Sequence, residues 1–147
     1  MSKSIFCIGN FTEEMKTQLK REYFPNEIIF ELFFFTGMAE LTGTDFWAKQ
    51  DMLKESLVGI LATHQSEADT QNQAQKSYSN NAERVLTFVR PVLPKVPINI
   101  IVPLDTSLSV KFMVDSNLDI QTKICPSMKE ASTLLLKQLK QEHLASA

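Results

Sequence analysis

The sequence predicts an α/β fold, a three-layer sandwich with a mainly parallel five-stranded sheet. One observation and one rule of chain connection lead to this prediction. Short apolar segments alternate with amphipathic, helix-like segments, five times in succession along the chain. Parallel strands need crossover connections, usually helices, so the alternation favours helices on both faces of the sheet. The 147 residues suit a single domain spanning 1–147, because no linker or internal repeat divides them.

The first strand and helix have clear end signals. The apolar run 5–8 predicts a buried strand that ends at Gly9-Asn10. Asn10 followed by Glu13 is a helix-start signature, and apolar residues then recur every four positions. We expect a helix over 11–24, which Pro25 stops.

The segment 28–35 is apolar on both alternations, with Glu31 as its exception. Such a pattern is typical of a central parallel strand buried on both faces. Under this interpretation Phe33, Phe34 and Phe35 are core residues.

The middle of the chain predicts a loop over 36–43, a helix capped by Thr44 or Asp45, and a third strand over 57–61 weakened by Gly59. The polar segment 65–81 is then either a projecting helix or a loop, and the pattern leaves both open.

The remaining segments complete the five strand–helix units. Polar and apolar residues alternate in the fifth predicted strand, which indicates a half-exposed edge strand. A capping box at Ser127 and Glu130 opens the final helix. In chain order, we expect a helix ending before Pro91, a fourth strand over 98–102, a short helix after 105–107, an edge strand over 118–125 and a final helix through Leu139.

Composition narrows the class of protein. The net charge of −2 gives no electrostatic case for a nucleic-acid partner. The two cysteines, Cys7 and Cys125, form no disulfide framework and suit a reducing compartment. No apolar run reaches membrane-spanning length or resembles a signal peptide, so a cytoplasmic location is expected, without a membrane partner.

Ligands of open parallel sheets bind outside the carboxyl ends of the strands. Polar residues gather at the predicted strand ends, although loops are polar simply because they are solvated. The candidate ligand rim consists of Asn10, Thr12, Thr36, Thr63, His64, Asp105, Thr106, Lys123 and Cys125.

Several chemistries lack their sequence signals. Four glycines provide neither a dinucleotide fingerprint nor a phosphate-binding loop, and no cofactor is expected. Two histidines and two distant cysteines have no metal-ligand spacing, so no metal is expected either. A Cys125–His64 nucleophile pair is the catalytic alternative, and a buried, inert cysteine is the simpler interpretation.

Lys123 in the fifth predicted strand, Pro126 after it and the final amphipathic helix complete an outline that resembles a response-regulator receiver domain, which has a flavodoxin-like fold. The likeness covers the whole chain and is mainly topological. Receivers carry acidic residues where this chain has Gly9-Asn10, and a phosphoacceptor aspartate where it has 62–64 (Ala-Thr-His). Thr106 is the candidate for their hydroxyl residue, and Lys123 does not adjoin the proline. The resemblance therefore implies a pseudo-receiver without Mg²⁺ or phosphorylation.

These observations favour a non-catalytic regulatory or assembly domain that binds another protein, with the segment 65–81 as a candidate partner surface. The alternative is a small-molecule-binding or enzymatic domain that uses His64, Asp105, Lys123 and Cys125. A homo-oligomer is the third hypothesis, and exposure of Phe33–Phe35 would favour it because large apolar patches mark interfaces.

Overall fold

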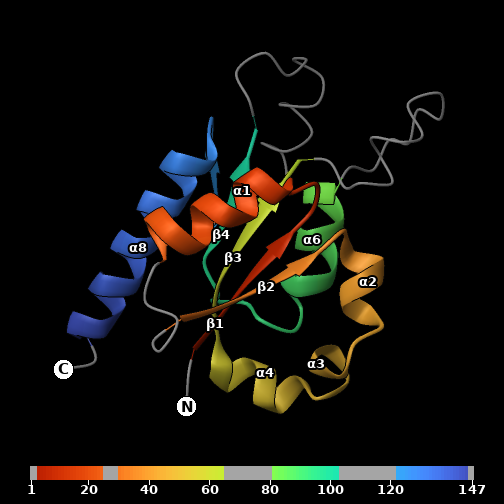
Figure 1. Cartoon of the computed structure of the whole chain (residues 1–147). Helices are drawn as coiled ribbons and strands as arrows, with labels where there is room; N and C mark the ends of the chain where they lie inside the picture. The colour runs from red at the N-terminus through yellow and green to blue at the C-terminus, as the bar shows by residue number, and fades with distance from the viewer. Residues whose placement is uncertain (1–2, 25–29, 65–80, 103–121, 146–147) are drawn as a thin grey trace, which may run out of the picture.

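A computed structural model of the chain describes residues 3–24, 30–64, 81–102 and 122–145, and the side chains up to residue 140. These residues form an α/β sandwich around a five-stranded, all-parallel sheet (Figure 1). The order across the sheet is β2-β1-β3-β4-β5, which is the flavodoxin-like order. The strands are β1 (Lys3–Ile8), β2 (Phe30–Phe35), β3 (Leu57–Thr63), β4 (Ile98–Ile101) and β5 (Thr122–Cys125).

Helices cover both faces of the sheet, as the crossover argument predicts. One face carries α1 (Glu13–Gln18), the π-helical turn η1 (Leu19–Tyr23) and α8 (Met128–Ala145). The other face carries α2 (Met38–Thr42), α3 (Asp45–Ala48), α4 (Gln50–Ser56) and α6 (Asn81–Val89). No helix in the described ranges is both long enough and apolar enough to cross a membrane.

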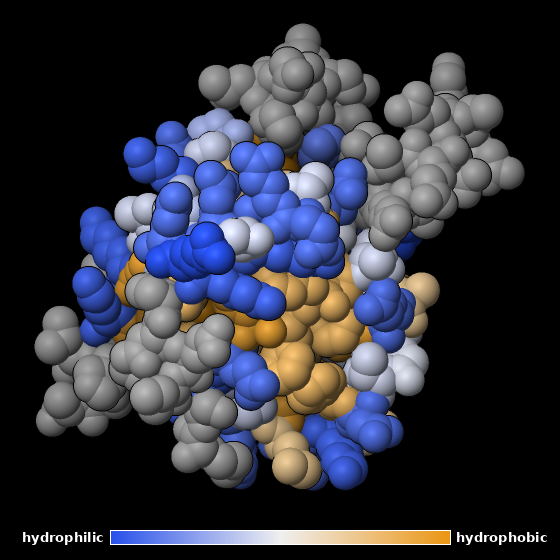
Figure 2. Space-filling model, viewed as in Figure 1, coloured by the Kyte–Doolittle hydropathy of each residue, from blue (hydrophilic) through white to orange (hydrophobic). Residues whose placement is uncertain are grey.

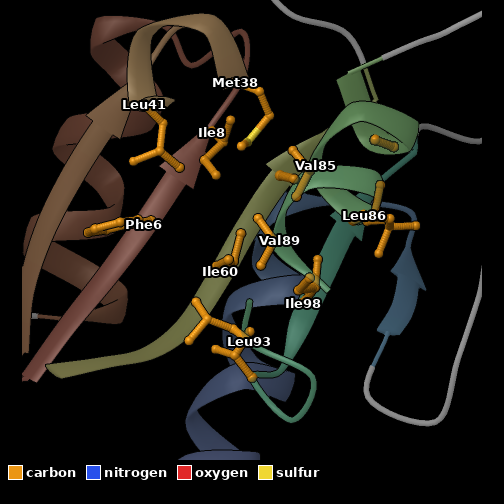
Figure 3. Packing of buried hydrophobic residues seen from close by; sticks show 14 of the residues in the cluster. Phe6, Ile8, Met38, Leu41, Ile60, Val85, Leu86, Val89, Leu93 and Ile98 are labelled. Carbon is orange, nitrogen blue, oxygen red and sulfur yellow. The ribbon is translucent and has the colours of Figure 1, made fainter. Parts of the chain in front are cut away.

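Strand β1 supplies both cores because its side chains alternate between the faces. Phe6 and Ile8 pack with α2, α4 and α6, and Figure 3 shows them facing Met38 and Leu41. Ile5 and Cys7 point the other way, toward α1 and α8. All four β1 side chains are fully buried, which explains why residues 5–8 read as a continuous apolar run.

The prediction that the Phe-rich segment is a central strand is wrong. β2 is the edge of the sheet and pairs with β1 alone. Glu31 is exposed, and Leu32, Phe33 and Phe34 are only half-buried, whereas Phe35 is buried in the core as predicted. Phe46 of α3 shields part of the Phe33 ring, and Phe11 shields part of the Phe34 ring. Such partial shielding does not require a second neighbouring strand.

Two predicted boundaries in the first half also change. Residues 36–43 contain α2 and are not a loop throughout. The helix after Thr44 is divided into α3 and α4 at Lys49, whose backbone (φ −107°, ψ 65°) is not helical. The first helix begins at Glu13, with Thr12 rather than Asn10 as its N-cap.

The second half follows the predictions where it is described. Helices α6 and α8 and strands β3 and β4 match their predicted segments within a few residues, and β5 is an edge strand. Ser127 caps α8 by accepting a hydrogen bond of 3.2 Å from the Glu130 amide. The predictions for 65–80, for the short helix after 105–107 and for 118–121 lie outside the described residues.

Candidate functional site

The carboxyl ends of all five strands lie at one edge of the sheet. The order reverses at β1, because the chain passes from β1 to β2 on one side and then to β3 on the other. The crevice between β1 and β3 is therefore the topological switch point, where open α/β sheets bind ligands.

Asn81, the first residue of α6, occupies this switch point. Its side-chain amide donates to the Ile8 carbonyl on β1 at 3.1 Å and to the Thr63 carbonyl on β3 at 2.7 Å. Its backbone N–H donates to the His64 carbonyl at 3.1 Å. Asn81 is fully buried, and its Oδ1 atom has no hydrogen-bond partner among the described residues. The residue thus holds together two strand ends and a helix start.

Asn10 and Thr63, both predicted rim residues, meet at this point. The Asn10 backbone N–H donates to Thr63 Oγ1 at 2.9 Å. Thr63 is nearly buried, so this contact fixes the turn after β1 against the end of β3. Thr12 is exposed, and its Oγ1 accepts the Met15 amide at 3.2 Å. Thr12 is therefore a helix cap, as its hydroxyl chemistry allows.

Thr36 lies just after β2, where its hydroxyl donates to Glu40 Oε2 at 2.6 Å. Lys123 is exposed within β5 and stands two residues before the strand end. Asp105 and Thr106 fall outside the described residues, as does the predicted His64–Asp105 pair.

Cys125 ends β5 and is nearly buried. Burial raises the pKa of its thiol, and the Glu130 carboxylate raises it further. Cys125 pairs with Ile101, which in turn pairs with Thr63, so two strand spacings, roughly 10 Å, separate Cys125 from Thr63. The raised pKa of the thiol is the opposite of the lowered pKa that an activated nucleophile needs.

The described part of the rim thus brings together Asn10, Thr63 and the unpredicted Asn81. The side chains of Thr63 and Asn81 bind main-chain groups of neighbouring segments and so join the ends of β1 and β3 to the start of α6. Within the described ranges no three His, Cys, Asp or Glu residues gather as metal ligands do. These contacts stabilise the crevice and do not form a nucleophile–base pair.

A second candidate site is the open edge of β2. Figure 2 shows apolar surface where Figure 1 places β2, below the polar surface of α1. We define the β2 edge surface as Leu32, Phe33, Phe34 and Phe46. The first three are half-buried, and Phe46 of α3 is 37% exposed.

Aromatic packing holds this surface in place. The rings of Phe33 and Phe46 meet edge-to-face with centroids 4.7 Å apart, and Phe46 also packs on the buried Phe6 at 5.4 Å. On the other face, Lys16 Nζ and Lys20 Nζ lie 5.5 and 5.6 Å from the centroid of the Phe34 ring. The surface is thus preformed and apolar in its middle. Lys20 and Lys16, which pairs with Glu13 at 3.1 Å, lie along its α1 side.

Comparison of the chain with protein-family models, curated proteins and solved structures finds no match. The candidate sites therefore rest on their own geometry.

Proposed function

We propose that this chain is a non-catalytic assembly domain that pairs its β2 edge with the same edge of a second copy. The observation that carries the proposal is an edge strand with apolar side chains on both faces. The backbone N–H and C=O groups on the outer side of such a strand are a template for pairing with another strand.

The protective features of an edge strand are scarce in β2. Proline, lysine and register breaks commonly block edge pairing. Residues 30–35 contain no proline or lysine, and β2 pairs with β1 in unbroken register. Glu31 is the one charged residue of the strand. An accessible edge with this composition favours strand addition.

A two-fold axis perpendicular to the sheet would join two β2 strands in antiparallel fashion and continue each face of the sheet. The half of β2 that carries Glu31 would then lie beside the half that carries Phe34, where Lys16 and Lys20 stand. Glu31 projects to the face that carries α3, and the lysines lie on the face that carries α1. The attraction between Glu31 of one copy and the lysines of the other is therefore long-range, without a direct ion pair.

A regulatory role of the pseudo-receiver type is supported by the strand order, which receiver domains share. It is also supported by Gly9-Asn10 after β1 and Thr63-His64 at the end of β3, which stand where receivers carry acidic residues and are not acidic themselves. Under this proposal the domain signals through association, without a phosphoacceptor.

The test is the molar mass in solution, measured by light scattering and sedimentation over a wide range of protein concentration. The wild-type chain should be a dimer. Phe33→Lys, and separately Phe34→Lys on the other face, should give monomers. Phe88→Lys is the matched control, because Phe88 is a 49% exposed phenylalanine on α6, away from β2.

Circular dichroism confirms that each variant is folded before its mass is interpreted. A wild-type monomer at every concentration would contradict the proposal. A dimer that survives both β2 substitutions would show that another surface associates.

A further inference from the structure

A groove of about 1240 Å³ lies at the amino ends of the strands, opposite the switch point at their carboxyl ends. It is formed by the starts of β1, β2 and β3, the connection 91–97 and the middle of α8. Its apolar lining includes Leu57, Val58, Leu136 and Leu139. Small-molecule sites typically have volumes of about 300–1,000 Å³, so the groove has room for a ligand of that size.

One wall of the groove is held rigidly. Arg90 Nη1 donates to the carbonyls of Leu93 at 3.2 Å and Val96 at 2.6 Å. Its Nη2 donates to Thr122 Oγ1 on β5 at 2.8 Å. The connection also contains three prolines, Pro91, Pro94 and Pro97, which restrict its backbone. A wall fixed in this way lowers the ordering cost of binding.

The rim of the groove has a charge opposite to that of the whole chain. Four lysines and a single acidic residue, Glu55, line it, whereas the chain carries a net charge of −2. The lysines, all exposed, are Lys3, Lys54, Lys95 and Lys140. Lys3 Nζ donates to the Glu55 backbone carbonyl at 3.2 Å, which holds this lysine at the rim.

An apolar floor beneath a cationic rim has the chemistry of a site for an amphipathic anion. We propose that this groove binds a free long-chain fatty acid. The hydrocarbon chain would replace water over the half-buried Val58 and Leu136, above the buried Leu57 and Leu139, and this loss of apolar contact with water is the favourable contribution. The carboxylate would stay at the solvated rim among the lysines, where it keeps part of its hydration and avoids the cost of burying a charge.

The test is isothermal titration calorimetry of the full chain with dodecanoate below its micelle concentration. Two probes test the charged headgroup and the hydrocarbon tail separately. Dodecyltrimethylammonium has the same tail and the opposite charge, and butyrate has the carboxylate without the long tail. We expect saturable binding of dodecanoate and little heat from the other two. Equal binding of the cationic probe would overturn the proposal.

The double variant Lys54→Glu/Lys140→Glu should weaken dodecanoate binding by about tenfold or more through charge reversal at the rim. Lys129→Glu, an exposed position on α8 outside the groove, is the control and should bind like the wild-type chain. Val58→Phe, which fills the floor, should also weaken binding while the lysines remain. Unchanged affinity in both groove variants would place dodecanoate elsewhere and overturn the proposal.

A membrane surface offers the same chemistry in another form. Sedimentation with vesicles of phosphatidylcholine and phosphatidylglycerol distinguishes a membrane surface from a free fatty acid as the ligand. Binding to vesicles without saturable binding of dodecanoate would replace the free fatty acid by a bilayer and contradict the proposal.

Discussion

Gly59 of β3 lies directly against Leu135 of α8. A Cβ atom built on Gly59 would stand 2.5 Å from Leu135 Cδ1 and 3.1 Å from Cδ2. Leu135 is fully buried, so its side chain has little room to move aside. The close approach of α8 to the sheet therefore requires glycine at this position.

We predict that Gly59→Ala lowers the free energy of unfolding by about 1–3 kcal/mol, the usual cost of overpacking a core. Urea unfolding monitored by circular dichroism measures it. Gly43→Ala is the matched control, because a Cβ atom there would stand 3.6 Å from the nearest atom, an ordinary contact. Equal stability of Gly59→Ala and the wild-type chain would show that α8 can shift without cost.

The sequence predicts the layers of this fold well because hydrophobic periodicity reports directly on burial. It predicts strand order less well. Apolar residues on both faces of 28–35 suit a central strand, and they suit equally an edge strand whose rings are shielded by Phe46 and Lys16. Periodicity describes the average environment of a side chain, not the identity of its neighbours.

The polar residues that matter most were not predicted from the sequence. Asn81 and Arg90 flank α6 and have the ordinary composition of a solvated helix end. Asn81 binds main-chain carbonyls of two strands, and Arg90 joins the nearby Val96 carbonyl to the Thr122 hydroxyl on β5. Only the tertiary arrangement brings these partners together. The location of the rim was predictable from the βα alternation, whereas its internal contacts were not.

Asn81 gives the second prediction. Asn81→Ala would leave the carbonyls of Ile8 and Thr63 without their amide donor, and a buried acceptor that loses its partner costs about 1–3 kcal/mol. Asn81→Asp should cost more at neutral pH, because a carboxylate would face two carbonyl oxygens. Urea unfolding at several pH values measures both effects.

The pH dependence of Asn81→Asp provides the control for its mechanism. Burial raises the pKa of a carboxyl, so the neutral acid, which can donate one hydrogen bond, is favoured in the folded chain. The stability gap to the wild-type chain should narrow as the pH falls. A gap that is independent of pH would contradict the donor role of Asn81.

Arg90 gives the third prediction. Arg90→Lys keeps the charge but loses the planar fork that reaches Leu93, Val96 and Thr122 together. We expect a loss of about 1.5–3 kcal/mol in the free energy of unfolding, the range for hydrogen bonds to a charged group. Arg21→Lys, at an exposed position on η1, is the control and should change little. An equally small effect at Arg90 would show that the prolines alone hold the connection.

The two cysteines give the last prediction. Burial raises the pKa of the Cys7 thiol far above its usual range, and burial together with Glu130 raises that of Cys125. Raised folded-state pKa values mean that the stability due to the neutral thiols is fully present below the unfolded-state value of about 8.5 and is lost as the pH rises above it. The free energy of unfolding should therefore fall between about pH 8.5 and 10, because the unfolded chain releases thiol protons that the folded chain keeps.

Cys7→Ala should be less stable at pH 7, where it leaves a small cavity, and its stability should decline less steeply over the alkaline range. Parallel slopes for the variant and the wild-type chain would show that other groups cause the alkaline loss.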